Sequence, residues 1–157
     1  MSENRTYEDL SIEFYSSSFL PAMQKLEKIC FPPDQAFDRR TLLHFMNDYD
    51  SVTLCMNRSA DNMIGFLIFS EVDSAIWELM TIEIDPAERG KGFGFLLLSE
   101  GMAEVETRKP KAIVLHVSTE NKPAIELYRK FGFHIVKSVR NYYNGGQSAF
   151  LMQKEFL

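Results

Sequence analysis

The chain has few cysteines, no long apolar run and no leader-like start. Cys30 and Cys55 are the two cysteines among 157 residues, and they stand in no metal-binding or redox spacing. We therefore interpret both as free thiols of a cytosolic protein and expect no metal site. No apolar run reaches the roughly 18–20 residues that span a bilayer, and the first residues lack a basic-then-apolar pattern. These absences predict a cytoplasmic protein with no membrane partner.

An excess of basic residues is also missing. The formal net charge is −5, with 17 basic and 22 acidic residues. This balance argues against nucleic acid as a direct partner, although a local basic loop could still hold a small anion. The chain shows no repeat, low-complexity segment or long linker. Its length fits one domain spanning residues 1–157.

The apolar periodicity predicts a mixed α/β domain. We expect helices at 19–29, from the cap Asp38 to residue 46, at 95–108 and at 121–131. We expect strands at 10–15, 51–57, 63–72, 75–84 and 112–118, and a final hairpin of 134–143 and 147–156 around Asn144-Gly145-Gly146. The early strands should be antiparallel, and the strand–helix–strand unit from 75 to 118 should pair in parallel.

A glycine-rich loop, Arg89-Gly90-Lys91-Gly92-Phe93-Gly94, stands between an expected strand and an expected helix. Backbone N–H groups at a helix N-terminus bind phosphate or pyrophosphate. The dinucleotide fingerprint fails because Leu97 occupies its third glycine position, and the Walker pattern fails because Gly92 replaces its Ser or Thr. The pattern that fits is Arg/Gln-x-x-Gly-x-Gly, although such glycines can also serve local turn geometry alone.

A second motif runs from Asn121 to Phe133 and reads N-x-x-A-x-x-L-Y-x-x-x-G-F. Asn121 can cap the helix or bond a ligand amide, and Ala124 leaves room for a ligand to pass. Tyr128 lies four residues beyond Ala124 on the same helix face. A buried helical tyrosine is by itself more often a core residue. Together the two motifs, in this order, resemble the GNAT superfamily of acetyl-CoA-dependent N-acetyltransferases over residues 75–157.

The resemblance implies a GNAT fold: a central mixed, largely antiparallel sheet of six to seven strands with helices on both faces. Its fourth and fifth strands (75–84 and 112–118) would be parallel and splayed around acetyl-CoA. Tyr128 would protonate the departing thiolate, which leaves as coenzyme A. The residues implied to hold acetyl-CoA are Ile82, Glu83, Ile84, Arg89, Gly90, Lys91, Gly92, Phe93, Gly94, Asn121, Ala124, Tyr128 and Lys130.

The general base has more than one candidate. An α-amine with pKa about 7.7–8.0 needs only modest help from a base. Strand alternation puts His116 on one face with Val114 and Ser118, and a neutral imidazole suits this task. Glu78 could act instead, alone or through a water shared with His116, and Glu83 is a weaker candidate. The alternatives are a structural His116 and a solvent-facing Glu78.

The acceptor is suggested by a narrower resemblance, to the RimI-type and NatE-catalytic-subunit-type protein N-terminal acetyltransferases. It rests on Phe31-Pro32, on Leu115-His116-Val117 and on Asn141-Tyr142-Tyr143. It implies that Phe31, Pro32, Pro33, Tyr142 and Tyr143 line the acceptor pocket. The chain departs from the NatE pattern at Glu78, where that enzyme has a catalytic tyrosine.

The sequence thus predicts acetyl transfer to the N-terminal α-amine of a protein or peptide, by direct attack in a ternary complex. A ribosomal protein or the ribosome is a possible partner, and the oligomeric state is not predicted. Three alternatives stay open: a small amine or lysine side chain as acceptor, a non-catalytic acetyl-CoA-binding regulatory domain, and a nucleotide-dependent oxidoreductase.

Overall fold

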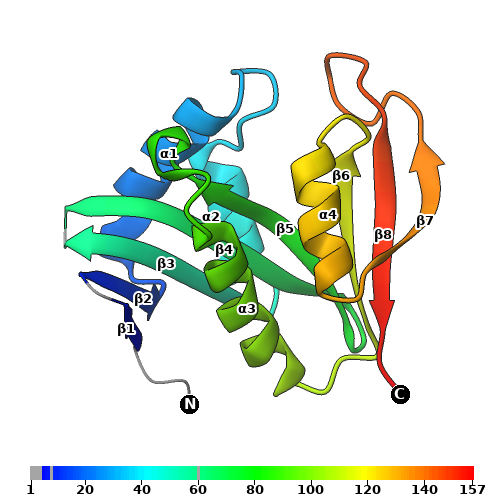
Figure 1. The fold of residues 1–157 in the computed structure, drawn as a ribbon, viewed down its shortest axis with the longest axis horizontal. Coiled ribbons are helices and arrows are strands. Elements are labelled where there is room, and N and C mark those ends of the chain that lie inside the picture. The colour runs from blue at the N-terminus through cyan, green and yellow to red at the C-terminus, as the bar shows by residue number, and fades with distance from the viewer. Residues whose placement is uncertain (1–4, 8, 60) are drawn as a thin grey trace.

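The computed structural model describes residues 5–7, 9–59 and 61–157, which form one mixed sheet flanked by helices (Figure 1). The strand order within these residues is β1-β2-β3-β4-β5-β6-β8-β7. The strands are β1 Arg5–Tyr7, β2 Leu10–Phe14, β3 Ser51–Ser59, β4 Asn62–Asp73, β5 Ile76–Ile84, β6 Ala112–Ser118, β7 His134–Val139 and β8 Ala149–Glu155. The helices are α1 Leu20–Cys30, α2 Arg39–Asn47, α3 Phe93–Glu106 and α4 Lys122–Lys130, with short 3-10 turns at Ser17–Phe19 and Pro86–Glu88.

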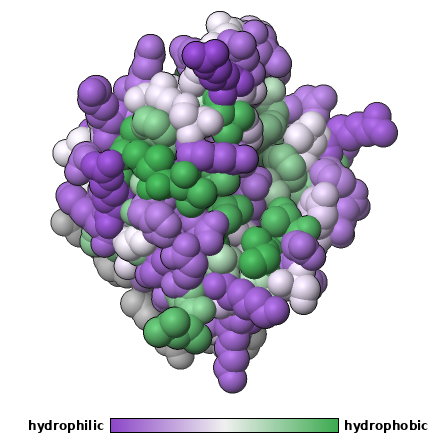
Figure 2. Space-filling model, turned by 90° about the vertical axis from the view of Figure 1, so that its right-hand side faces the viewer, coloured by the Kyte–Doolittle hydropathy of each residue, from purple (hydrophilic) through white to green (hydrophobic). Residues whose placement is uncertain are grey.

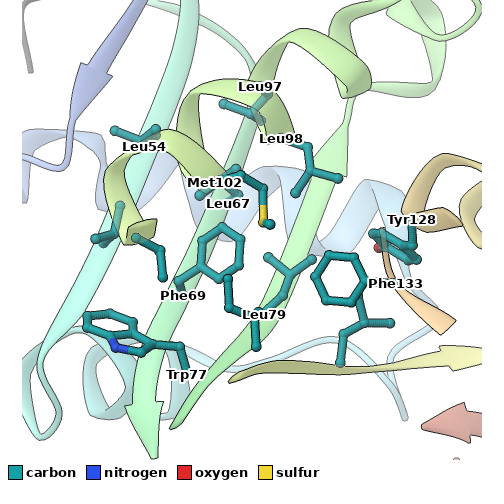
Figure 3. Packing of buried hydrophobic residues seen from close by; sticks show 14 of the residues in the cluster. Leu54, Leu67, Phe69, Trp77, Leu79, Leu97, Leu98, Met102, Tyr128 and Phe133 are labelled. Carbon is teal, nitrogen blue, oxygen red and sulfur yellow. The ribbon is translucent and has the colours of Figure 1, made fainter. Parts of the chain in front are cut away.

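Helices cover both faces of this sheet, as predicted. On one face α1 and α2 pack on alternate side chains of β3 and β4, among them Cys55 and Phe66. On the other face α3 and α4 bury Leu97, Leu98 and Tyr128 against Leu54 and neighbouring sheet residues (Figure 3). Each fully buried Leu of this kind contributes about 1.5–3 kcal/mol. The two-sided burial holds the sheet between two apolar layers, so its central strands are rigid supports.

The helix that follows the glycine loop approaches the sheet closely at Gly101. A Cβ built at this position would lie 2.7 Å from Leu67 Cδ2 and 2.9 Å from Phe69 Cε2. Only glycine allows that separation without displacing both side chains. This contact sets the position of α3 relative to β4, and hence the position of the helix N-terminus.

The strands β5 and β6 are parallel, as predicted, but they pair along only part of their length. Their register runs from Ile76 opposite Ala112 to Leu79 opposite Leu115. An irregularity in the β4–β5 pairing leaves Met80 without a partner on β4. Beyond it β6 continues beside β8 as far as Ser118 opposite Ala149. The two strands therefore diverge toward their carboxyl ends, as Figure 1 shows.

The sheet has one strand more than predicted and a longer final connection. The additional strand is the three-residue β1, which is too short to produce an apolar pattern. The tight turn at 143–146 forms, with Gly146 N–H donating to Tyr143 O at 2.9 Å. The predicted strand at 134–143 is wrong beyond Val139, because Asn141 adopts a left-handed φ of 52° that ends the ladder.

The outer edge of the sheet at β7 has a mixed surface. Viewed from that side, apolar patches are interspersed with hydrophilic side chains (Figure 2). Val136 is 48% exposed, and Lys137 beside it is exposed as well. Charged residues on an edge strand disfavour pairing with another chain. In the part of the chain that the structure describes, no helix is long and apolar enough to cross a membrane.

Candidate active site

The glycine loop forms the turn into α3. Gly90 and Gly92 adopt left-handed φ values of 79° and 84°, and Gly92 is the N-cap residue of the helix. No atom lies within 4 Å of a Cβ built at either glycine, so the loop faces open space. The first N–H groups of α3 have no acceptor within the helix. These features fit a polyanion such as the pyrophosphate of coenzyme A.

Charged side chains around this loop are partly paired with one another. Lys91 Nζ lies 3.0 Å from Glu88 Oε2, which also accepts from Arg58 Nη2 at 2.9 Å. Hydrogen bonds from Arg58 and Lys91 lower the pKa of Glu88 to about 2. Arg89 Nε donates to Ile84 O at 3.0 Å, which fastens the loop to the end of β5. Arg58 also pairs with Asp9 Oδ1 at 3.1 Å, and it belongs to a strand that sequence reasoning left out of the site.

The divergence of β5 and β6 opens a cavity of about 320 Å³. Thr81 and Ile82 line it from β5, and His116 to Ser118 line it from β6. Tyr128 reaches it from α4 and is only 7% exposed, with its ring in an edge contact to Phe133 at 6.1 Å between centroids. Burial, followed by the nearby Tyr143, raises the pKa of the Tyr128 phenol above its ordinary value. The phenol therefore stays protonated at neutral pH and can act as an acid.

A second cavity of about 200 Å³ adjoins the first. The two share His116 and Tyr143 among other lining residues. The His116 ring stacks on Tyr142, with centroids 4.4 Å apart and an interplanar angle of 13°. Burial, assisted by Lys137, lowers the pKa of His116 below its usual value. The imidazole is consequently neutral at cytosolic pH, as a general base requires.

Glu78 lines the smaller cavity together with His116. Burial raises the pKa of this carboxyl above its ordinary range. Burial, Glu78 and Tyr143 raise the pKa of Tyr142 to about 12, so its hydroxyl is a neutral donor. The structure thus brings both base candidates to one cavity wall, and it brings Tyr128 to the adjoining cavity.

Two loops far apart in the sequence close this region. Asn144 Nδ2 donates to Asp34 O at 2.6 Å, which joins the loop after α1 to the loop between β7 and β8. Phe31 and Pro32 line the larger cavity, whereas the exposed Pro33 lines neither. One wall of the smaller cavity is therefore held together by a hydrogen bond across 110 positions of sequence.

Of four other predicted site residues, three lie outside the two cavities and Asn121 lines the larger one. The Glu83 side chain is 3% exposed and turns toward α1, so it lines neither cavity. Lys130 is exposed on α4, and Ala124 packs partly buried against the core. Asn121 lines the larger cavity while its Oδ1 caps α4 by accepting from Ala124 N–H at 3.3 Å.

Several lining residues escaped the sequence analysis. One ends α1, one lies at the β5 irregularity, and the others lie in the loop after α1 and in the loop before β8. No local pattern marks any of them as part of a site. They are Cys30, Asp34, Gln35, Phe37, Met80, Asn144 and Gln147.

The comparison with protein families agrees with this architecture. The acetyltransferase (GNAT) family profile matches residues 20–133, which include α1, both diverging strands, the glycine loop and α4. The chain belongs to the GNAT acetyltransferase family.

Two proteins illustrate which members of the family this chain is similar to. The chain is 31% identical over 146 residues to the [ribosomal protein bS18]-alanine N-acetyltransferase of Salmonella typhimurium, covering 90% of this chain and 95% of that protein. It is 35% identical over 127 residues to an uncharacterized Mycobacterium leprae protein, covering 78% of this chain and 33% of that protein. The chain thus spans a third of the length of that mycobacterial relative.

A solved structure gives the same picture. The ribosomal-protein-S18-alanine N-acetyltransferase of Escherichia coli superposes with a TM-score of 0.82 at 25% sequence identity. The superposition covers 93% of both chains. The mixed, splayed sheet described above is therefore the GNAT fold over nearly the whole chain.

Proposed function

We propose that this chain is an acetyl-CoA-dependent N-acetyltransferase that acts on the N-terminal α-amine of a protein or peptide. The observation that carries the proposal is the cavity at the β5–β6 divergence, which is lined by both Tyr128 and His116. An acid and a base on one cavity match the two proton transfers of amine acetylation. The family match and the relatives named for alanine N-acetylation support the same activity.

The donor is held, in this proposal, by the glycine loop and the divergent strands. Residues 89–94 would take the pyrophosphate, because their glycines leave open space and the α3 N-terminus presents N–H groups. Backbone groups of 82–84 would hold the acetyl carbonyl, since β5 has no β6 partner beyond Leu79. Asn121, Ala124 and Lys130 are further contacts on α4. Acetyl-CoA supplies the activated acetyl thioester, and no metal takes part.

The chain's own groups would carry the proton transfers. His116, neutral because burial lowers its pKa, accepts the amine proton directly or through a water shared with Glu78. Backbone N–H groups beside the thioester stabilise the developing oxyanion. Tyr128, protonated because burial raises its pKa, donates to the departing sulfur. Neither Cys30 nor Cys55 is assigned a nucleophilic role, because burial raises their pKa values to about 11 and about 12.

The acceptor would enter through the smaller cavity. Its wall carries the carboxyl groups of Asp34 and Glu78, which attract an α-ammonium before it loses its proton. Tyr142 and Tyr143 would frame the first residue, with Phe31 and Pro32 at the side of the larger cavity. A ribosomal protein is one acceptor of this kind. The free cysteines favour a reducing compartment, and we place the reaction in the cytoplasm.

A peptide panel tests the proposal. Peptides that differ in their first two residues are incubated with acetyl-CoA, and the acetylated position is located by mass spectrometry. A lysine-containing peptide with a blocked N-terminus and the polyamine spermidine serve as matched acceptors of the competing classes. The proposal predicts transfer to free α-amines only. Transfer confined to lysine or spermidine would show that the acceptor is a side-chain or small-molecule amine and not an α-amine. Binding of acetyl-CoA without any transfer would indicate a regulatory domain.

A further inference from the structure

Two carboxyl groups are buried together beneath the active site. Glu27 lies on the apolar face of α1 and is fully buried, and Glu83 on β5 is 3% exposed. Neither side chain lines the two cavities. Because isolated charges are costly in such a place, a buried pair of carboxyl groups requires an explanation.

Each carboxyl has one oxygen bonded and one without a donor. Glu27 Oε2 accepts from Phe37 N–H at 2.9 Å, and Glu83 Oε2 accepts from Thr81 Oγ1 at 3.1 Å. Among the residues that the structure describes, no donor reaches Glu27 Oε1 or Glu83 Oε1, although both atoms are buried. After burial, Glu27 is the next largest cause of the raised pKa of Glu83, so the two carboxyl groups are close enough to interact directly. One proton between them would satisfy both orphan oxygens and remove one of two like charges.

Among the described residues, none of the groups that shift the pKa of Glu83 is a cation that would neutralise a second charge. Burial, and then Glu27, raise the pKa of Glu83 to about 10. Cys30 at the end of α1 is a neutral thiol near Glu83 and Glu27, and Thr81 donates a neutral hydroxyl. Arg89 faces Cys30 but donates its Nε to Ile84 O. From β3, Cys55 packs in the same core layer, also as a neutral thiol.

We propose that Glu27 and Glu83 share one proton, and that this acid–carboxylate hydrogen bond positions β5 against α1 at the floor of the active site. The partners of the pair show what it holds in place. Phe37 N–H belongs to the loop after α1, and Phe37 and Thr81 both line the larger cavity. Cys30 Sγ donates to Ile84 O at 3.6 Å on the same seam. Glu27 and Glu83 are positioning residues, and only their effect on turnover rests on the proposed function.

The shared proton can be observed without any substrate. Carboxyl-carbon NMR of protein labelled with ¹³C at the glutamate side chains follows each carboxyl through a pH titration. We expect one glutamate signal to keep the chemical shift of the neutral acid at pH 7, and Glu83→Gln to remove it. If every glutamate titrates close to the ordinary pKa of about 4.3, the proposal is wrong.

Stability gives a second readout with a defined sign. The unfolded chain ionises Glu83 near its ordinary pKa, while burial and the neighbouring Glu27 keep the proton on the folded chain to a higher pH. Between these values the unfolded state binds fewer protons, so the unfolding equilibrium constant rises with pH by up to about tenfold per unit. Glu83→Gln removes this slope and should gain stability relative to the wild type from pH 5 to pH 9. Glu104→Gln, partly exposed on α3, should leave the slope unchanged.

Measurement of kcat/KM distinguishes a positioning role of the carboxyl pair from a role in packing alone. The amide of Glu27→Gln can still accept from Phe37 N–H and donate to Glu83, so kcat/KM should stay within about twofold of wild type at pH 7. Glu27→Met has similar length but neither donor nor acceptor, and misplacement of β5 should lower kcat/KM by about tenfold to a hundredfold. Equal losses in both variants would refute the positioning role. If no acceptor is found at all, the proposed function fails. The NMR titration and the stability measurements still decide whether Glu27 and Glu83 share a proton.

Discussion

Removal of the Tyr128 hydroxyl is the sharpest test of the chemistry. In water a phenol of pKa about 10 protonates a thiolate of pKa about 8.5 at a cost of about 2 kcal/mol. Burial raises the pKa of Tyr128 further, but the same cavity desolvates the thiolate and raises the pKa of the thiol too. Tyr128 can therefore act as an acid throughout the ordinary assay range.

Tyr128→Phe should lower kcat by about 10²–10⁴-fold, the range of a lost general acid, or about 3–5 kcal/mol in activation free energy. The ring remains packed against Phe133, so acetyl-CoA affinity should change little. The free energy of unfolding should change by about 1 kcal/mol or less. The measurements are steady-state release of the coenzyme A thiol at saturating donor, calorimetric titration with acetyl-CoA, and denaturant unfolding.

A matched control and a rescue make this test decisive. Tyr49→Phe removes a hydroxyl from a partly exposed ring that contacts His44 and lines neither cavity, so its turnover should equal wild type. An acetyl thioester whose thiol has a lower pKa needs no acid, so it should restore much of the rate of Tyr128→Phe. A variant with kcat within about threefold of wild type, or one that the better leaving group does not rescue, would refute the reasoning.

Three further predictions concern the base, the loop and the closing contact. Because burial lowers the pKa of His116, kcat/KM plotted against pH should rise with a midpoint below pH 6.5. His116→Ala should abolish this rise. If only Glu78→Gln abolishes it, Glu78 is the base. Gly92→Ala and Gly92→Asp should each cost about 1–2 kcal/mol of stability from the left-handed φ of 84°, but only the Asp variant should strongly weaken acetyl-CoA binding in calorimetry. Asn144→Ala, which breaks the bond to Asp34 O, should raise KM for the peptide at least about threefold while KM for acetyl-CoA stays unchanged.

The fold was largely predictable from local signals. Proline, glycine and capping residues limit the helices, and Asp38 and Asn121 cap α2 and α4 as their positions indicate. The buried strand Ala112–Ser118 has the predicted limits. The strand predicted at 134–143 was too long because Tyr142 and Tyr143 are good strand formers, whereas the left-handed Asn141 ends the ladder before them. Strand propensity is a weak guide where the conformation of a single residue decides where the strand ends.

The acceptor side was less predictable, because its residues meet only in three dimensions. Asp34 and Asn144 carry no pattern, and their contact spans 110 positions. Glu27 had a readable signal, since it falls four residues after Met23 on the apolar face of its helix, but its partner cannot be found that way. The sequence made the Glu83 side chain a weaker candidate for the base, whereas in the structure that side chain is buried beside Glu27 of α1.

The sequence by itself determined the family, and it predicted the ligand class of the glycine loop and Tyr128 as the acid, because each depends on residues within about a dozen positions of one another. Tertiary structure decided which base candidates share a wall with Tyr142, which loops meet at the smaller cavity, and where the Glu83 side chain points. Those properties depend on where β5 and β6 part and on how α1 packs beneath them. Packing between segments that are far apart in the sequence sets these properties, so they cannot be predicted from local sequence patterns.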